Sequence, residues 1–365
     1  TLMADDNISV KQVTTTDSGD LGPAEDFTSI AGGTFTLGNG EINVVGAVVI
    51  DHTGTVTLAS DVTGGSVAIT SDSTSANAVF ASVAGVDISA TGGNLDITTP
   101  NGGLNRGTAT RAATDGSITL MADDNISVKQ VTTIDSGAAG PAESFSSTAG
   151  GTFILGTGGI DVVGDAALDH DGTVTLNGTV TAGNDFTSTG AGAFTQNAAG
   201  SIDVVGNVEL THEGTVTLNG AVMADGSFSS GGTGSFSLNN GASIIAAGIT
   251  LMHDGTTTIS GLADSSSSFD SAGTGNLSLT ATGTIEADAA VTIDHDGTIT
   301  LASDVTGGSV AITSGSNSVN AVLASAAGVE ITATDGNVDI TAASGGLNLG
   351  NAALAATDGS ITLSA

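Results

Sequence analysis

The chain repeats itself, and this repetition constrains the fold more than any other feature. The phrase TLMADDNISVKQVTT at residues 1–15 returns at residues 119–133. A second phrase, LASDVTGGSVAIT at residues 58–70, recurs unchanged 243 residues later at residues 301–313. Repeats of this kind are typical of arrays in which each unit packs only on its neighbours. We therefore expect residues 1–365 to form one continuous segment of a longer array, holding about one and a half copies of a 243-residue unit.

A shorter period predicts the secondary structure. Pentads of the pattern Gly-x-apolar-x-apolar recur every 20 to 22 residues, beginning at Gly151, Gly172, Gly192, Gly214, Gly234, Gly255, Gly275 and Gly297. Alternating apolar residues give a short strand with one face inward. A further strand phrase, such as IDVV at residues 160–163, lies between alternate pentads and doubles the period to about 42 residues. The sequence thus predicts an all-β fold, a parallel β-helix (β-solenoid) with coils of about 20–21 residues.

Other all-β architectures fit less well. A propeller blade needs about 40 residues and four strands. Tandem immunoglobulin-like domains would repeat near 100 residues around a buried aromatic anchor. The chain has no Trp or Tyr for the aromatic signature pairs usual in a propeller, and nothing in it repeats near 100 residues.

The composition agrees with a narrow solenoid interior. The chain has 55 Gly and 10 Phe but no Trp, Tyr or Cys. Small and β-branched side chains stack well in a thin core, and glycine permits tight corners. We expect the phenylalanines to form an internal column. Disulfides and thiolate metal sites are excluded because there is no cysteine.

The charge excludes several kinds of partner. Four Lys and Arg stand against 38 Asp and Glu, for a formal net charge of −34. Such a chain repels phosphate backbones and anionic lipids, so we expect neither nucleic-acid binding nor membrane insertion. Acidic residues also recur in pairs at equivalent positions: Asp161 and Asp203, Asp87 and Glu330, and Asp96 and Asp339. Stacked carboxylates repel one another, which salt or Ca²⁺ could relieve, although the GGxGxD motif of calcium β-rolls is absent.

Two segments break the register. The pentads at Gly116 and Gly151 are 35 residues apart, and the excess predicts a protruding loop at residues 129–144, with its first copy at residues 11–26. The two lysines, Lys11 and Lys129, belong to these loops. The two arginines, Arg106 and Arg111, belong to another irregular stretch. We hypothesise that these bulges contact acidic surface on a neighbouring molecule.

All five histidines share one position in the repeat, in DHTG, DHDG, THEG, MHDG and DHDG phrases beginning at residues 51, 169, 211, 252 and 294. Asp-Gly is typical turn chemistry, and we favour a structural corner. The alternative is a cation site, for which the candidate ligands are Asp169, His170 and Asp171 in one copy and Asp294, His295 and Asp296 in another. No other cofactor is expected, and Ca²⁺ is the ion considered.

Outward Thr and Ser residues form a second regular pattern, for example Thr173 with Thr175 and Thr215 with Thr217. Threonine is a good exposed strand residue, which explains the pattern without a ligand. Rows of this kind also occur on ice-binding proteins. Ala193 and Asn276 interrupt the pattern and favour the simpler explanation.

We do not expect an enzyme. The acidic residues follow the repeat instead of breaking it, aromatic platforms for sugars are missing, and no Gly-x-Ser-x-Gly elbow, Walker loop or metalloprotease motif occurs.

The GTVTL and GSITL strand phrases in coils of about 20 residues resemble the filamentous haemagglutinin-like repeats of giant bacterial surface and secreted proteins. The resemblance implies export to the cell surface or beyond and a role in adhesion or extracellular fibres. We expect an extracellular structural protein that self-associates with other copies into a fibre, filament or sheath. The alternative is the rod-like stalk of an adhesin that binds a host or partner cell. A calcium-stabilised matrix protein and an ice-binding solenoid are further alternatives.

Overall fold

A computed structural model describes the chain except for residues 18–24, 82–84, 138–142, 325, 327 and 351. The chain forms two compact units, Thr1–Thr189 and Gly190–Ala365. Every described element is a strand, and the strands pair in parallel, so each unit is a β-solenoid, with about 15 turns in the two units together. No helix long and apolar enough to cross a membrane occurs among the described residues.

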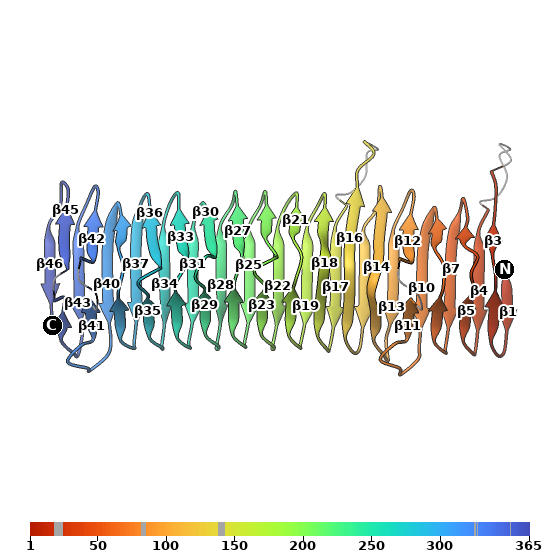
Figure 1. The fold of residues 1–365 in the computed structure, drawn as a ribbon, viewed down its shortest axis with the longest axis horizontal. Helices are drawn as coiled ribbons and strands as arrows, with labels where there is room; N and C mark the ends of the chain where they lie inside the picture. Colours follow the sequence, from red (N-terminus) through yellow and green to blue (C-terminus); the bar gives the residue numbers. More distant parts are fainter. Residues whose placement is uncertain (18–24, 82–84, 138–142, 325, 327, 351) are drawn as a thin grey trace. The chain divides into compact units, whose positions relative to one another are not determined.

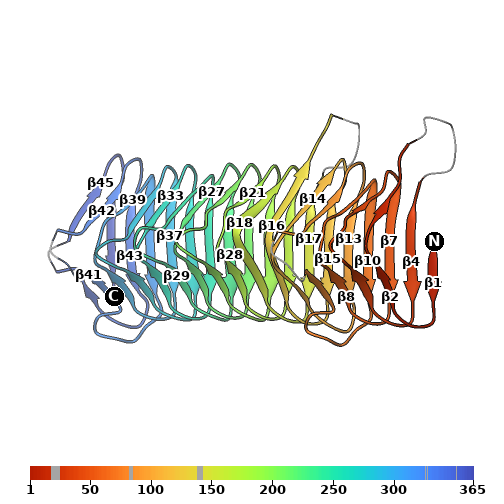
Figure 2. The ribbon, with the colours of Figure 1, turned by 45° about the vertical axis from the view of Figure 1, so that its right-hand side comes forward.

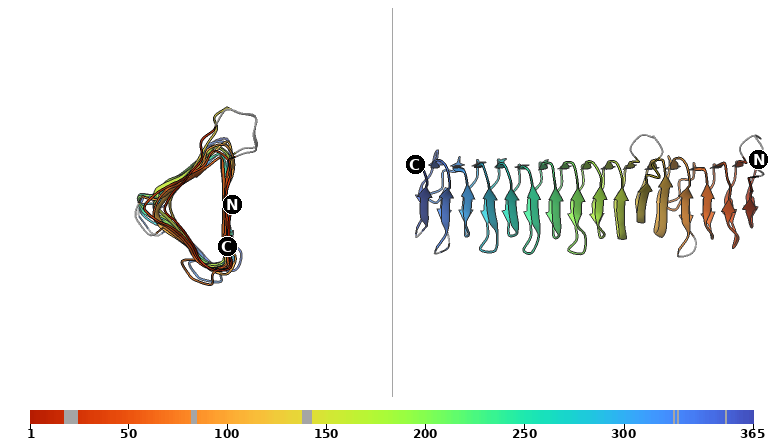
Figure 3. Two further views of the ribbon diagram at one scale, coloured as in Figure 1. Left: turned by 90° about the vertical axis from the view of Figure 1, so that its right-hand side faces the viewer. Right: turned by 90° about the horizontal axis from the view of Figure 1, so that it is seen from above.

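A coil consists of three short strands joined by corners (Figures 1 and 3). In unit 1, for example, the chain runs through β7 (Ala47–His52), β8 (Val56–Leu58) and β9 (Val62–Gly64). It then returns in β10 (Ser66–Ser71), which lies beside β7 in register, with Ser66 opposite Ala47 and Ser71 opposite His52 (Figure 2). One coil therefore takes about 20 residues and rises by one strand spacing, about 4.8 Å.

The strands of unit 1 stack on three sides. The first side holds β1 (Leu2–Ala4), β4 (Phe27–Ala31), β7, β10, β13 (Leu95–Thr99), β15 (Ile118–Ala122), β17 (Phe145–Ala149), β19 (Ala166–His170) and β22 (Phe186–Gly190), which ends at the unit boundary. The second side holds β2 (Ile8–Val10), β5 (Phe35–Leu37), β8, β11 (Val79–Ala81) and β20 (Val174–Leu176). The third side holds β3 (Val13–Thr14), β6 (Ile42–Asn43), β9, β12 (Asp87–Ala90) and β21 (Val180–Ala182). Three long strands span the second and third sides: β14 (Leu104–Thr114), β16 (Ile126–Ile134) and β18 (Phe153–Val162).

Unit 2 repeats this arrangement. Its first side holds β25 (Val208–His212), β28 (Phe228–Gly232), β31 (Ile249–His253), β34 (Phe269–Gly273), β37 (Ala290–His295), β40 (Ser309–Ser314), β43 (Val338–Ala342) and β46 (Ile361–Ser364). The second side holds β23 (Phe194–Gln196), β26 (Val216–Leu218), β29 (Phe236–Leu238), β32 (Thr257–Ile259), β35 (Leu277–Leu279), β38 (Ile299–Leu301), β41 (Val322–Ala324) and β44 (Leu347–Asn348). The third side holds β24 (Ile202–Val204), β27 (Ala221–Ala224), β30 (Ser243–Ala246), β33 (Leu262–Ser265), β36 (Thr284–Ala287), β39 (Val305–Gly307), β42 (Glu330–Ala333) and β45 (Ala353–Ala356).

Side-chain alternation builds the core. In the pentad strands, such as β8 and β26, the first and third residues are buried and the middle one is half-exposed. Stacking places apolar residues of adjacent coils opposite one another, so Val216 lies opposite Phe236 and Leu218 opposite Leu238. The expected internal phenylalanines are confirmed: Phe27, Phe35, Phe145, Phe153, Phe186, Phe194, Phe228, Phe236 and Phe269 are all buried. The side chain of Phe80 lies outside the described set.

The irregular segments differ in part from the expected loops. Within residues 129–144, the chain continues strand β16 up to Ile134, with a shift of register between Val128 and Gln130. Residues 138–142 of this loop, and residues 18–24 of the earlier one, lie outside the described residues. Lys11 and Lys129 are exposed.

Arg111 departs from the expectation of a surface bulge. It is fully buried in β14, in a column between Ile88 and Val131. Burial lowers the pKa of Arg111 to about 9, against the opposing effect of the Asp87 charge. A buried guanidinium cannot contact a neighbouring molecule, so among the cations whose side chains the structure describes, only Lys11 and Lys129 are available for that role. The side chain of Arg106 lies outside the described set.

Candidate functional site

The histidine position lies inside the solenoid. Each of the five histidines ends a first-side strand and is buried, with 0–1% of its surface exposed. Four of them approach a serine hydroxyl in the preceding coil through Nε2. The distances are 3.0 Å for His52 and Ser29, 3.0 Å for His170 and Ser147, 2.9 Å for His253 and Ser230, and 3.0 Å for His295 and Ser271. The repeated histidine is thus an internal polar link between coils.

The partners of the other ring nitrogen fix its protonation. Nδ1 of His52 lies 3.2 Å from the carbonyl oxygen of Gly33, and Nδ1 of His295 lies 3.2 Å from that of Gly275. A carbonyl can only accept, so Nδ1 carries the proton and Nε2 accepts the serine O–H. Burial lowers the pKa of His52, His212, His253 and His295, although the carbonyl contact and nearby Asp residues act in the opposite direction where present. The rings of these four histidines are therefore neutral at pH 7.

Aromatic packing completes the environment. The ring centroids of Phe35 and His52 are 5.3 Å apart, and those of Phe153 and His170 are 5.1 Å apart. The corresponding pairs in unit 2, Phe194 with His212 and Phe236 with His253, are each separated by 5.5 Å. Such edge-on and tilted contacts are favourable for aromatic rings.

The serine belongs to a second repeated phrase. The repeat period by itself does not indicate what this phrase does. Strands of the pattern Phe-x-Ser-x-Ala/Gly precede each histidine strand by one coil. The last residue of this phrase is small and lies opposite the histidine, as Ala149 does opposite His170 and Gly273 opposite His295. The two-coil period of about 42 residues thus arises because a coil that provides Phe, Ser and space alternates with one that provides His.

The six candidate cation ligands are not brought together. His170 and His295 point inward, whereas Asp169, Asp171, Asp294 and Asp296 are exposed. Asp169 accepts a hydrogen bond of 3.0 Å from the hydroxyl of Thr189. None of the six belongs to a group of three converging ligand atoms in the described part of the chain. The geometry favours the structural interpretation of the histidine corner, and cation binding at these residues stays a prediction.

No protein-family model matches the chain, and no curated protein or solved structure matches it.

Many surface carboxylates and amides have a structural role at the corners. The side-chain oxygens of Asn7, Asn125 and Asn276 each accept a backbone N–H from the next coil at 2.7–2.8 Å. Asp26, Asp61 and Asp304 do the same at 2.7–2.9 Å. These side chains cap corner N–H groups that no strand partner satisfies.

Direct stacking of like charges is largely avoided. The strand neighbours of Asp161 are Thr132 and Thr181, and Asp203 lies opposite Met223. Asp264 does lie directly opposite Glu286. Separation by neutral residues relieves the repulsion at most of the repeated positions without a bound ion.

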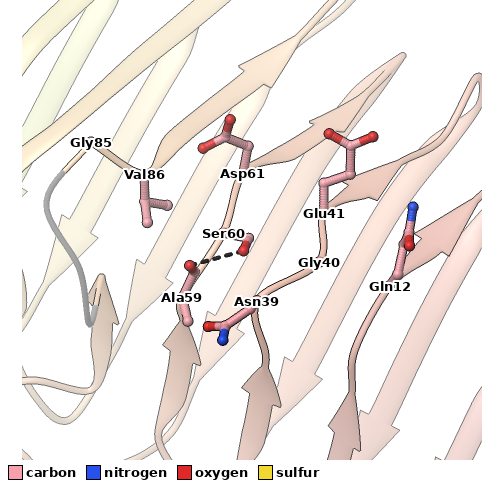
Figure 4. A pocket seen from close by; sticks show the side chains of 9 residues that line it. All are labelled: Gln12, Asn39, Gly40, Glu41, Ala59, Ser60, Asp61, Gly85 and Val86. Atoms are coloured by element: carbon pink, nitrogen blue, oxygen red, sulfur yellow. Dashed lines mark hydrogen bonds between the residues drawn. The ribbon is translucent and has the colours of Figure 1, made fainter.

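One shallow groove of about 510 Å³ lies in unit 1 where four successive coils turn from the second side to the third (Figure 4). Glu41, Asp61 and Gln12 project from successive coils along it. The rest of the lining is Asn39, Gly40, Ala59, Ser60, Gly85 and Val86. The groove is polar and exposed, and it offers the carboxylates of Glu41 and Asp61 but no buried catalytic group among its described residues.

The outward hydroxyl pattern is continuous in unit 2 on one line. The middle residues of six second-side strands lie opposite one another in the order Thr195, Thr217, Ser237, Thr258, Ser278 and Thr300. Leu323 ends the line. Ala193 and Asn276, which interrupt the Thr and Ser pattern in the sequence, do not interrupt this line. Each lies directly before a second-side strand, β23 or β35, and not at its middle position.

Proposed function

We propose that this chain is a structural segment of an extracellular fibre, filament or sheath on a bacterial surface. The proposal is supported above all by the use of repeated residues for packing and capping. The polar phrase that recurs most strictly, Asp-His-x-Gly and its variants, places its histidine in the core. The recurring corner acids hold backbone N–H groups. A chain whose most regular polar residues link stacked coils and cap their corners is suited to a structural scaffold.

The resemblance to filamentous haemagglutinin-like repeats adds the cellular setting. It rests on the strand phrases and coil length, and the parallel coils agree with it. Export, the cell surface and association with further copies of the same protein belong to this proposal. A catalytic role does not, because the polar groups of the interior are shielded from any substrate.

The exposed lysines give the proposal a contact between copies. Lys11 and Lys129 occur at equivalent places 118 residues apart, on a surface whose other ionised groups are mostly carboxylates. A lysine at such a place is attracted to the acidic corners of a neighbouring copy.

Negative-stain electron microscopy of the purified chain tests the proposal. We expect ordered filaments or bundles, and we expect Lys11→Glu combined with Lys129→Glu to reduce bundling relative to a Glu41→Gln control. Isolated thin particles that never associate would favour the adhesin stalk instead. Compact globular particles would contradict both functions.

A further inference from the structure

Three carboxylates from separate parts of unit 1 converge at the base of the second irregular segment. Asp115 lies in the turn between β14 and β15, Asp135 directly follows β16, and Glu143 lies two residues before β17. One oxygen from each lies within 4.8 Å of the others. No other group of three potential ligands converges in this way within the described residues.

The backbone holds these residues in place. Asp115 has a φ of 54°, in the left-handed region, and its N–H donates to the carbonyl of Ile134 at 2.9 Å. The hydroxyl of Thr133 donates to the carbonyl of Glu143 at 2.7 Å and accepts the N–H of Val163 at 3.0 Å. The turn, the end of β16 and the start of β17 are thereby fastened together, so the three carboxylates meet without depending on residues 138–142.

Glu143 is the residue that indicates a ligand. Its side chain is 4% exposed, and within the described part of the chain its carboxylate has no hydrogen-bond donor or cation. The other two are partly satisfied, since Asp115 accepts both the N–H and the hydroxyl of Ser136, at 2.8 and 2.6 Å, and Asp135 accepts the N–H of Gly137 at 2.6 Å. A carboxylate side chain this largely buried, with no donor among the described residues and two other carboxylates beside it, is stabilised by a positive charge.

We propose that Asp115, Asp135 and Glu143 bind one Ca²⁺ ion. All the ligands are hard oxygens, which Ca²⁺ prefers, and its coordination is flexible enough to accept three protein carboxylates with water in the remaining positions. Oxygens that share one Ca²⁺ at about 2.3–2.6 Å lie at most about 5.2 Å apart. The observed separations fit this limit. The ion neutralises Glu143 and stiffens the base of the irregular segment. The site is independent of the proposed fibre function.

The chain contains a matched control. Asp358 stands 243 residues after Asp115 in the same TDGSITL phrase and has the same unusual backbone, with a φ of 55°. No converging pair of carboxylates accompanies it among the described residues. A general loss of surface charge or a disturbed turn should therefore affect Asp115 and Asp358 alike, whereas loss of a ligand should affect Asp115 alone.

Isothermal titration of the metal-free full chain with CaCl₂ tests the proposal. We expect one principal site, weakened at least about tenfold by Asp115→Asn or by Glu143→Gln and unchanged by Asp358→Asn. Binding by the wild-type chain should also raise its melting temperature, followed by circular dichroism because the chain lacks Trp and Tyr.

Two results would overturn it. One is the absence of saturable Ca²⁺ binding by the wild-type chain. The other is equal loss of binding in the Asp115→Asn and Asp358→Asn variants. Glu143→Gln keeps the side-chain volume, and an unchanged circular dichroism spectrum in this variant shows that reduced binding is not caused by misfolding.

Discussion

The buried histidines show how a polar residue enters a core made of small side chains. The complete arrangement has a donor for Nε2, an acceptor for Nδ1 and space for the ring. Ser271, the Gly275 carbonyl and Gly273 supply these three things to His295. A methyl group at position 273 would collide with the backbone of His253 and lie 3.6 Å from the ring of His295. The requirement for glycine is therefore local and physical.

These histidines should make the fold sensitive to acid. Burial lowers the pKa of His52, His212, His253 and His295 below the ordinary value near 6.5. Above that value, neither the folded nor the unfolded chain is protonated there. Below it, the histidines bind protons in the unfolded chain but not yet in the folded chain. The free energy of unfolding therefore decreases as the pH is lowered, until the pH reaches the lower pKa of the folded state. Urea unfolding at pH 7.5 and pH 5.5 should show a lower midpoint at pH 5.5.

A paired substitution separates this effect from the titration of the carboxylates. His253→Leu with Ser230→Ala removes both members of one hydrogen bond and leaves neither unsatisfied. We expect a smaller difference between the two pH values than in the wild-type chain. An unchanged difference would mean that the histidine does not contribute.

At the scale of the element, corner caps hold successive coils in register. The Asn276 side-chain oxygen accepts the Thr298 N–H at 2.8 Å and its hydroxyl at 3.0 Å, and the Asn125 oxygen makes the same two contacts to Thr152. The pattern is the same in the two units, and it joins the start of a second-side strand to the corner one coil earlier.

Removing one cap should cost a modest amount of stability. We expect Asn276→Ala to lower the free energy of unfolding by about 0.5–1.5 kcal/mol, because the hydrogen bonds are lost at an exposed corner where water can replace them in part. Asn276→Asp keeps an acceptor oxygen in the same place and should lose less. Chemical denaturation of the two variants measures both values, and an equal loss would argue against the cap.

The repeat predicted the elements well because strand period and apolar alternation are local properties. The pentad beginning at Gly214 gave strand β26 and its inward faces directly. The Ser–His link could not be predicted in the same way, because Ser230 and His253 are 23 residues apart and meet only through stacking. The sequence does contain a signal for the Ser–His link: a Phe-x-Ser-x-Gly phrase occurs one coil before the histidine phrase. The carboxylate cluster at Asp115 was missed because the repeat is broken there, and Arg111 was misplaced for the same reason.

At the scale of the whole molecule, each unit is organised by one rule: residues separated by one coil lie side by side and in parallel. The net charge of −34 is distributed over outward and corner positions by this rule instead of forming one acidic site. Among the described residues, the exposed charged side chains are carboxylates except for Lys11 and Lys129.

Cysteine cross-linking in the naturally cysteine-free chain tests this rule most directly. Ser237 and Thr258 are neighbours in adjacent strands of unit 2, whereas Ser278 lies one coil beyond Thr258. Adjacent coils are about 4.8 Å apart and alternate coils about 9.6 Å apart, and only the shorter distance suits a disulfide. We predict that Ser237→Cys with Thr258→Cys oxidises rapidly to an intramolecular disulfide, detected by mass spectrometry, and that Ser237→Cys with Ser278→Cys does not. Rapid cross-linking of the second pair, or none in the first, would contradict the parallel solenoid.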